Sequence, residues 1–112
     1  MKCLSIQIQP DKQPDLEAKD VIEKIKVYCS GLSIVSSLEL NESFDKSRYI
    51  NVNIITNNLK LLWDKLSKSI YKDSVFGPYL SKTSIVVCEG NNGWDDYLLL
   101  HHFDKSEAID NL

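Results

Sequence analysis

The sequence predicts a single α+β domain, in which a five-stranded, mainly antiparallel sheet carries two helices on one face. Several short segments alternate between apolar and polar residues, as half-buried strands do. Two longer segments repeat apolar residues at helical spacing. The length of 112 residues suits one hydrophobic core, and a content of 43% hydrophobic and 26% charged residues is ordinary for a globular domain. We therefore treat residues 1–112 as one domain.

The first half of the chain predicts a strand, a helix and two further strands. Residues 3–9 alternate, with Leu4, Ile6 and Ile8 on one face. A helix is expected to open at Pro14 or Asp15 and to stop at Gly31, a residue suited to the left-handed position after a helix. Its apolar stripe comprises Ala18, Ile22, Ile25, Cys29 and Leu32. Residues 33–40 and 48–56 predict strands joined by a polar connection over 41–47.

The second half predicts a helix and a hairpin. Asn57 or Asn58 is placed to cap a helix whose apolar stripe comprises Leu59, Leu62, Trp63, Leu66 and Ile70. Residues 73–82 contain Gly77 and Pro78, and they are expected to form a loop folded back onto the core. Residues 83–89 and 94–103 predict two strands joined by a tight turn at residues 90–93, Gly-Asn-Asn-Gly.

The predicted element order is β-α-β-β-α-β-β. Its first six elements resemble the ferredoxin-like βαββαβ sandwich, and the last adds a C-terminal hairpin strand. This plan implies a spatial strand order of 2-3-1-4-5 with both helices on one face. The opposite face would then carry small polar side chains: Ser5, Gln7, Gln9, Asn51 and Asn53. Such a face suits water or a wet interface better than an apolar substrate.

Charge and cysteine content narrow the function classes. Thirteen basic residues, only one of them arginine, face sixteen acidic residues for a net charge of −3, which argues against direct nucleic-acid binding. The N-terminus lacks the apolar run of a signal peptide and no stretch is long enough to span a membrane, so we expect a cytoplasmic protein. Cys3, Cys29 and Cys88 are odd in number and widely spaced, which predicts reduced thiols, with Cys29 buried.

Motifs for catalysis, cofactors or metals are not found in the sequence. Neighbouring side chains on a strand point to opposite faces, so His101 and His102 are not expected to form one chelate. The Gly-Asn-Asn-Gly turn joins two strands and lacks the helix of a phosphate loop. Lys60, Lys65, Lys68 and Lys72 on the second helix suit a solvated face. We expect no catalytic, cofactor-binding or metal-binding residues.

The most function-like feature lies around the hairpin turn. Residues 83–112 carry one lysine and six acidic residues, for a net charge of −5. Within this segment, aromatic residues stand among carboxylates, and the five candidate partner-binding residues are Glu89, Trp94, Asp95, Asp96 and Tyr97. Carboxylates speed encounter with a basic protein and an aromatic side chain can anchor it, although a Trp after a turn also serves as a packing anchor. The pattern predicts a surface for a basic protein partner.

In size, acidity and its acidic–aromatic patch the chain resembles bacterial immunity proteins, the antitoxins that neutralise secreted nuclease toxins. The resemblance implies a small cytoplasmic inhibitor whose acidic surface occupies the basic cleft of a toxin. The alternative is a ferredoxin-like small-molecule-binding protein or enzyme that forms a homodimer through its open sheet face. A toxin gene directly upstream would favour the first interpretation.

Overall fold

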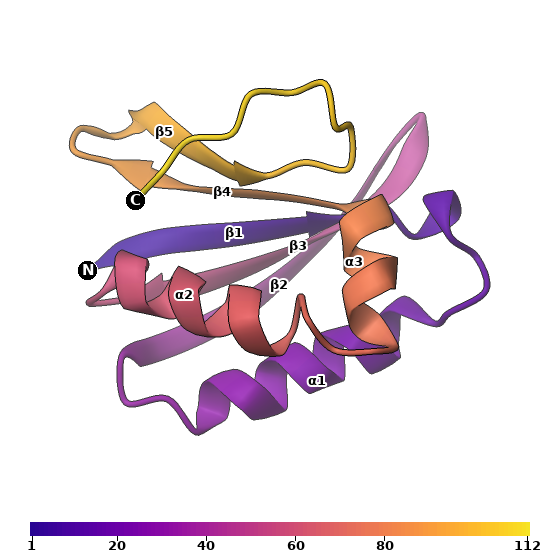
Figure 1. The fold of residues 1–112 in the computed structure, drawn as a ribbon, viewed down its shortest axis with the longest axis horizontal. Coiled ribbons are helices and arrows are strands. Elements are labelled where there is room, and N and C mark those ends of the chain that lie inside the picture. The colour runs from indigo at the N-terminus through magenta and orange to yellow at the C-terminus, as the bar shows by residue number, and fades with distance from the viewer.

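The computed structural model describes residues 1–112, with the side chain of Asp45 left out of the description (Figure 1). It confirms an α+β fold with a five-stranded antiparallel sheet. The α-helices number three in the described chain, where the sequence predicts two. In chain order the elements are β1 (Lys2–Ile8), the 3-10 turn η1 (Pro10–Lys12), α1 (Ala18–Ser30), β2 (Val35–Asp45), β3 (Ser47–Thr56), α2 (Leu59–Ser69), α3 (Phe76–Thr83), β4 (Ser84–Gly90) and β5 (Gly93–His101).

The strands lie in the order β2-β3-β1-β4-β5. The central strand β1 pairs antiparallel with both of its neighbours, so that Leu4 lies opposite Ile54 of β3 and opposite Cys88 of β4. This leaves β2 and β5 as the edge strands at the two ends of the sheet.

The core forms on the face that carries the apolar set of each central strand. The strand members of the core alternate with more exposed residues: Leu4, Ile6 and Ile8, Ile50, Val52 and Ile54, and Val86 and Cys88. Helix residues that the spacing predicts for the core are buried as well: Ile22 and Ile25 of α1, and Leu62 and Leu66 of α2. The period-2 and period-3.6 patterns therefore identify the buried residues correctly.

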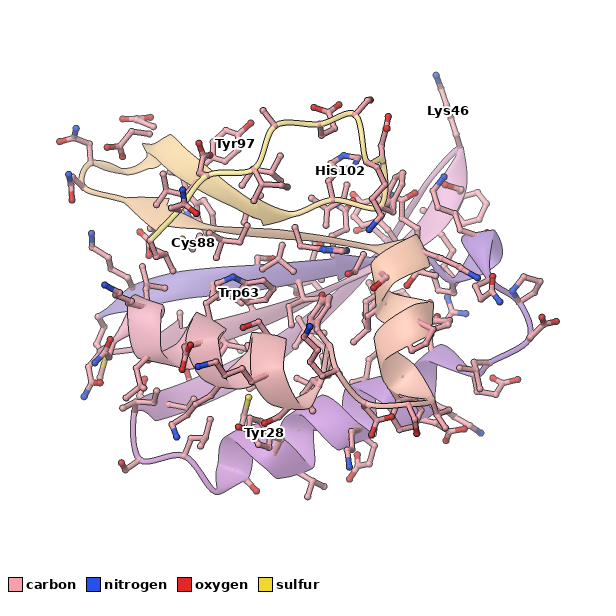
Figure 2. The ribbon with its side chains drawn as sticks, viewed as in Figure 1. Tyr28, Lys46, Trp63, Cys88, Tyr97 and His102 are labelled. Atoms are coloured by element: carbon pink, nitrogen blue, oxygen red, sulfur yellow. The ribbon has the colours of Figure 1, made fainter. Side chains whose placement is uncertain are left out.

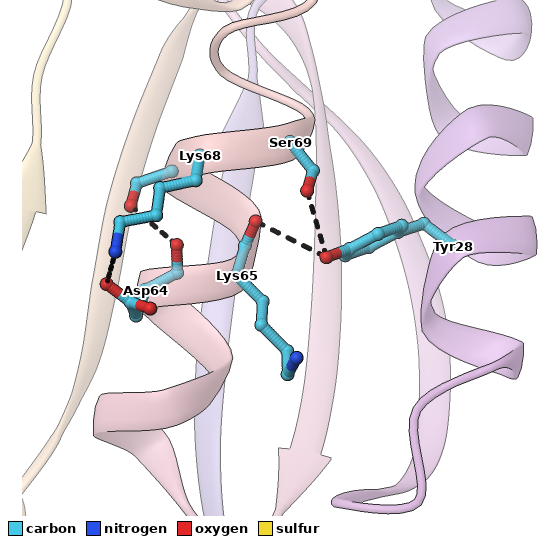
Figure 3. Close-up of polar contacts among 6 residues, drawn as sticks. Tyr28, Asp64, Lys65, Lys68 and Ser69 are labelled. Atoms are coloured by element: carbon cyan, nitrogen blue, oxygen red, sulfur yellow. Dashed lines mark hydrogen bonds and ion pairs between the residues drawn. The ribbon is translucent and has the colours of Figure 1, made fainter.

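Helices α1 and α2 are joined by a tyrosine (Figure 3). The Tyr28 hydroxyl on α1 donates to the carbonyl of Lys65 at 3.5 Å and accepts a bond from Ser69 Oγ at 3.0 Å. Tyr28 thereby bridges the two helices above the apolar stripes that they bury in the core.

The ends of α1 differ from the prediction. The helix begins at Ala18 rather than at Pro14 or Asp15, and its N-cap residue Glu17 makes no side-chain capping bond. At the other end Gly31 adopts φ −90°, so it is not left-handed. The Gly31 N–H bonds to the carbonyl of Tyr28 at 3.2 Å, and this tighter last turn ends the helix instead.

Helix α3 lies where the sequence predicts a loop. Pro78 is the third residue of the helix, a place in the first turn where proline is tolerated because its missing N–H needs no partner. Asp73 caps the start, since its Oδ2 accepts bonds from the N–H groups of Val75 at 3.0 Å and Phe76 at 2.8 Å. These two bonds lower the pKa of Asp73. Gly77 and Pro78 therefore lie in the first turn of a helix rather than in a loop.

The β2–β3 hairpin is longer than predicted. The sequence predicts a connection over 41–47, whereas β2 continues to Asp45 and the turn is made at Lys46, with φ 64°. The Lys46 side chain points away from the hairpin tip (Figure 2). The polar residues 41–43 are exposed, so this end of the strand lacks the apolar alternation that marks a covered strand.

The C-terminal residues return along β5 (Figure 1). The Asp110 N–H donates to the carbonyl of Leu99 at 2.7 Å, and Asp110 Oδ2 accepts the Leu99 N–H at 2.8 Å. The tail thus covers part of the outer edge of β5. Across the described residues, no helix has both the length and the apolar character needed to cross a membrane.

Candidate functional site

All five predicted partner-binding residues lie at the hairpin that joins β4 to β5. Glu89 lies near the end of β4, and Trp94, Asp95, Asp96 and Tyr97 form the first half of β5 after the turn. The sequence thus places the five residues on the correct elements, but it does not predict the irregular strand pairing around them.

An irregularity in strand pairing displaces four of these residues. Gly90 pairs with Gly93, and the next pair is Cys88 with Leu98. Between these pairs β4 contributes only Glu89, whereas β5 contributes residues 94–97. The longer segment has to bulge out of the ladder, as bulged strands do. We call residues 94–97 the β5 bulge.

The β5 bulge presents two large aromatic side chains to solvent. Trp94 is 46% exposed and Tyr97 is 57% exposed. Tyr97 is labelled in Figure 2. Neither ring belongs to the buried core, and both are accessible from solvent. Asp95 lies between the two aromatic residues and is also exposed.

Asp96 has a structural role in the turn. Its Oδ1 accepts the N–H of Asn92 at 2.8 Å, and its backbone carbonyl oxygen occupies the space that a Cβ on residue 90 would need. Gly93 adopts φ 73°, which favours glycine. The two glycines and Asp96 together form the tight turn from which the bulge starts.

Glu89 is also used within the fold. Its Oε2 accepts the N–H of Cys3 at the start of β1. Next to it, Lys2 Nζ donates to the carbonyl of Gly90 at 2.8 Å. Glu89 is only half-exposed, so its carboxylate anchors β1 and contributes less to the surface than Asp95. Trp94, Asp95 and Tyr97 therefore form the outward-facing part of the candidate site.

The two histidines have local structural partners. The ring of His101 lies 5.1 Å from that of Tyr71, and its Nε2 is buried without a hydrogen bond. Burial is the main cause that lowers the pKa of His101, the charge of Lys105 adds to it, and the carbonyls of Ser81 and Leu80 oppose it. His102 Nδ1 instead accepts the N–H of Asp104 at 2.9 Å. Groups of three or more ligands suited to a metal do not occur among the described residues.

The cysteines are free thiols in three separate places. Cys29 is buried on α1, as predicted. Leu4 is the residue opposite Cys88, so Cys3 and Cys88 belong to opposite faces of the sheet. Burial raises the pKa of each thiol, that of Cys29 to about 11, and Glu89 adds to the effect on Cys3. Thiols with raised pKa values are poor nucleophiles at neutral pH.

The lysine side chains of α2 include one surface ion pair. Lys68 Nζ lies 2.9 Å from Asp64 Oδ1, one turn earlier, and both side chains are largely exposed. Such pairs stabilise a fold by about 0–1 kcal/mol. The geometry agrees with a solvated face.

A hollow of about 490 Å³ between α2 and the C-terminal residues was not predicted. Its apolar lining comes from Leu61, Trp63 and Leu112, and its polar lining includes Asn58 and Asp64. The helical spacing places Trp63 at the edge of the apolar stripe, but no sequence pattern shows that the tail returns to α2.

Comparison of the chain with protein-family models, with curated proteins and with solved structures finds no match. The function is therefore argued from the geometry of the site.

Proposed function

We propose that this chain is a small protein-binding inhibitor that acts through the β5 bulge. The observation that carries the proposal is the exposure of Trp94 and Tyr97 on either side of Asp95, in a segment that has left the sheet ladder. Interface hot spots are enriched in Trp and Tyr, and two such rings exposed on one short segment offer a partner a contact surface.

The expected partner is a protein with a basic surface. The chain has a net charge of −3, and its last thirty residues carry −5. Acidic surfaces steer basic partners and set their orientation. A bacterial immunity protein that blocks a nuclease or other basic toxin in the cytoplasm has this character, and no catalytic role is proposed for the chain itself.

The fold behind this surface is proposed to be ferredoxin-like with an added strand. The strand order β2-β3-β1-β4-β5 and the antiparallel pairing on both sides of β1 support this assignment. Burial of one alternating set on each central strand supports placing the helices on one face. Helix α3 then belongs to the second crossover together with α2.

Binding to the product of the gene directly upstream tests the function. We expect co-expression of the chain to restore growth of cells that make that product, and the purified pair to form a complex. Trp94→Ala should weaken the complex by about 2 kcal/mol or more, mainly through faster dissociation. Asp95→Lys should slow association and reduce its dependence on salt.

Phe44→Ala is the matched control, because Phe44 is an exposed aromatic residue on β2, at the opposite edge of the sheet. It should leave the affinity unchanged. If the Trp94 and Asp95 variants bind as tightly as the parent, with the same salt dependence, the interface lies elsewhere and the proposal fails.

A second candidate function is small-molecule binding, and the hollow beside Trp63 favours it. Its volume of about 490 Å³ is within the range of about 300–1,000 Å³ typical of ligand sites. A compound bound there would change the fluorescence of Trp63 but not that of the exposed Trp94. The expected assembly for this alternative is a homodimer through the open sheet face, which sedimentation would detect.

A further inference from the structure

The hollow between α2 and the C-terminal residues joins apolar and polar surface in one place. Its apolar part comes from Leu61, Trp63 and Leu112. The other lining residues are polar and come from both sides of the hollow: Asn58, Lys60, Asp64, Ser67 and Asn111. A ligand in this hollow therefore meets an aromatic ring and hydrogen-bonding groups together.

The charged side chains of the lining balance each other. Lys60 is the one cation among the lining residues, and Asp64 is the one acidic side chain. Asp64 Oδ1 is also paired with Lys68 Nζ at 2.9 Å (Figure 3). Like charges repel, so a ligand with a strong charge of either sign would meet an unfavourable side chain here. The lining therefore suits an uncharged ligand.

The polar side chains of the lining keep hydrogen-bonding capacity of both kinds. Asn58 Oδ1 accepts the N–H of Leu61 at 3.1 Å, which leaves the NH₂ group of Asn58 to donate. Ser67 Oγ donates to the backbone carbonyl of Asp64 at 3.0 Å, which leaves its lone pairs to accept. The Asn111 amide both donates and accepts. The hollow thus offers donors and acceptors to the same ligand.

Hydroxyl groups match such a mixed set, because each of them donates one hydrogen bond and accepts others. A sugar ring carries several hydroxyl groups around its edge, while its C–H groups form an apolar face. An aromatic side chain offers a large apolar surface to such a face. Trp63 is the largest apolar side chain in the lining, and its ring packs against that of Tyr71 at 5.3 Å.

We propose that the hollow beside Trp63 binds an uncharged sugar of one or two rings. The apolar face of one ring packs against Trp63, and hydroxyl groups bond to Asn58, Ser67 and Asn111. This inference rests on the second candidate function, small-molecule binding at this hollow, and names the class of ligand. It does not depend on the β5 bulge.

The probes are the methyl glycosides of glucose, galactose and mannose, and the two-ring sugar cellobiose. The chain has two tryptophans, so in the Trp94→Phe variant the fluorescence reports on Trp63 alone. We expect at least one probe to change this fluorescence, with a dissociation constant on the order of 1 mM. In the ¹⁵N-labelled chain the same probe should shift amide signals of α2 and of residues 110–112.

Cyclohexylmethanol is the matched control ligand, because it has a six-membered ring and a single hydroxyl group. It should bind about tenfold more weakly than the best sugar, since it leaves most of the polar groups of the lining without a partner.

The hydrogen bonds are tested on the protein with Asn111→Ala. This variant should weaken binding of the sugar about three- to tenfold, the effect of one or two neutral hydrogen bonds. Asn41→Ala makes the same change at an exposed position of β2, at the other edge of the sheet, and should leave the affinity unchanged. Lys60→Gln should change the affinity less than about twofold, because an uncharged ligand gains little from the cation.

Three results would overturn the proposal while leaving small-molecule binding in place. One is binding of cyclohexylmethanol as tight as that of the sugars, another is equal affinity of Asn111→Ala and Asn41→Ala, and the third is shifted signals outside α2 and the tail. If none of the probes, cyclohexylmethanol included, changes the fluorescence of Trp63, small-molecule binding at this hollow fails together with the proposal.

Discussion

At the scale of single residues, the same side chains serve both the fold and the surface. Asp96 and Glu89 are carboxylates of the predicted site, yet each accepts a backbone N–H that shapes the hairpin or anchors β1. Asp95 lies between them in the chain and faces solvent. Hydrogen bonds within the fold therefore hold two of the carboxylates of this patch in position.

His101 is expected to make the stability of the fold depend on pH. Burial lowers its pKa in the folded chain below the ordinary value of 6.5. The unfolded chain therefore binds a proton first, and stability that is complete above pH 6.5 declines as the pH falls toward the folded pKa. We expect the urea concentration at the unfolding midpoint to decrease as the pH is lowered from 7 to about 5. Carboxyl groups of ordinary pKa are still mostly ionised in this range.

His101→Phe supplies the comparison, because it keeps an aromatic ring beside Tyr71 without a titrating group. Its urea midpoint should change less over the same pH range than that of the parent chain. Equal pH dependence in the two proteins would show that His101 is not responsible.

At the scale of elements, α3 depends on a close approach between backbone groups. A Cβ on Gly77 would lie 2.6 Å from the carbonyl oxygen of Tyr71, too close for real atoms. Gly77→Ala should therefore destabilise the fold by about 1–3 kcal/mol, although alanine favours a helix by about 0.5–1 kcal/mol. Denaturant melts measure the difference.

Gly31→Ala is the matched control for that substitution. Its Cβ would lie 3.6 Å from the Tyr28 carbonyl oxygen, an ordinary contact, and φ is −90°. Its stability should stay close to that of the parent. If Gly77→Ala and Gly31→Ala have the same unfolding midpoint, the backbone of Tyr71 makes room for a Cβ on residue 77 and the prediction is wrong.

Prediction from sequence succeeds for elements whose burial is periodic. The alternation of β1 and β3 and the stripes of α1 and α2 identify their elements and their core residues. Helix α3 is missed because Gly77 and Pro78 are typical of loops, and only the cap from Asp73 shows that they begin a helix. The C-terminal end of β2 is missed because its residues 41–44 are exposed and therefore show no alternation of apolar and polar side chains.

The candidate site is predictable only in part for a similar reason. The acidic–aromatic composition of residues 89–97 is visible in the sequence. The β5 bulge is not, because it depends on how many residues of β5 face one residue of β4. The hollow beside Trp63 arises from contacts between segments far apart in the chain, and no local pattern predicts it.

At the scale of the whole molecule, the sheet is asymmetric. One end carries the β5 bulge and a strand edge partly covered by the tail, and the other carries the free edge of β2. The exposed rings of the bulge and the free edge of β2 therefore lie at opposite ends of the sheet.

The tail should also keep β5 from pairing with other chains. Deletion of residues 104–112 removes both hydrogen bonds that Asp110 makes to Leu99, and leaves the edge N–H and carbonyl of Leu99 unpaired. Because unpaired strand edges promote association, we expect the shortened chain to self-associate in sedimentation velocity experiments. Asp110→Ala removes only the side-chain bond and should associate less than the deletion. A shortened chain that stays monomeric, with an unchanged unfolding midpoint, would show that the tail lies on the edge without protecting it.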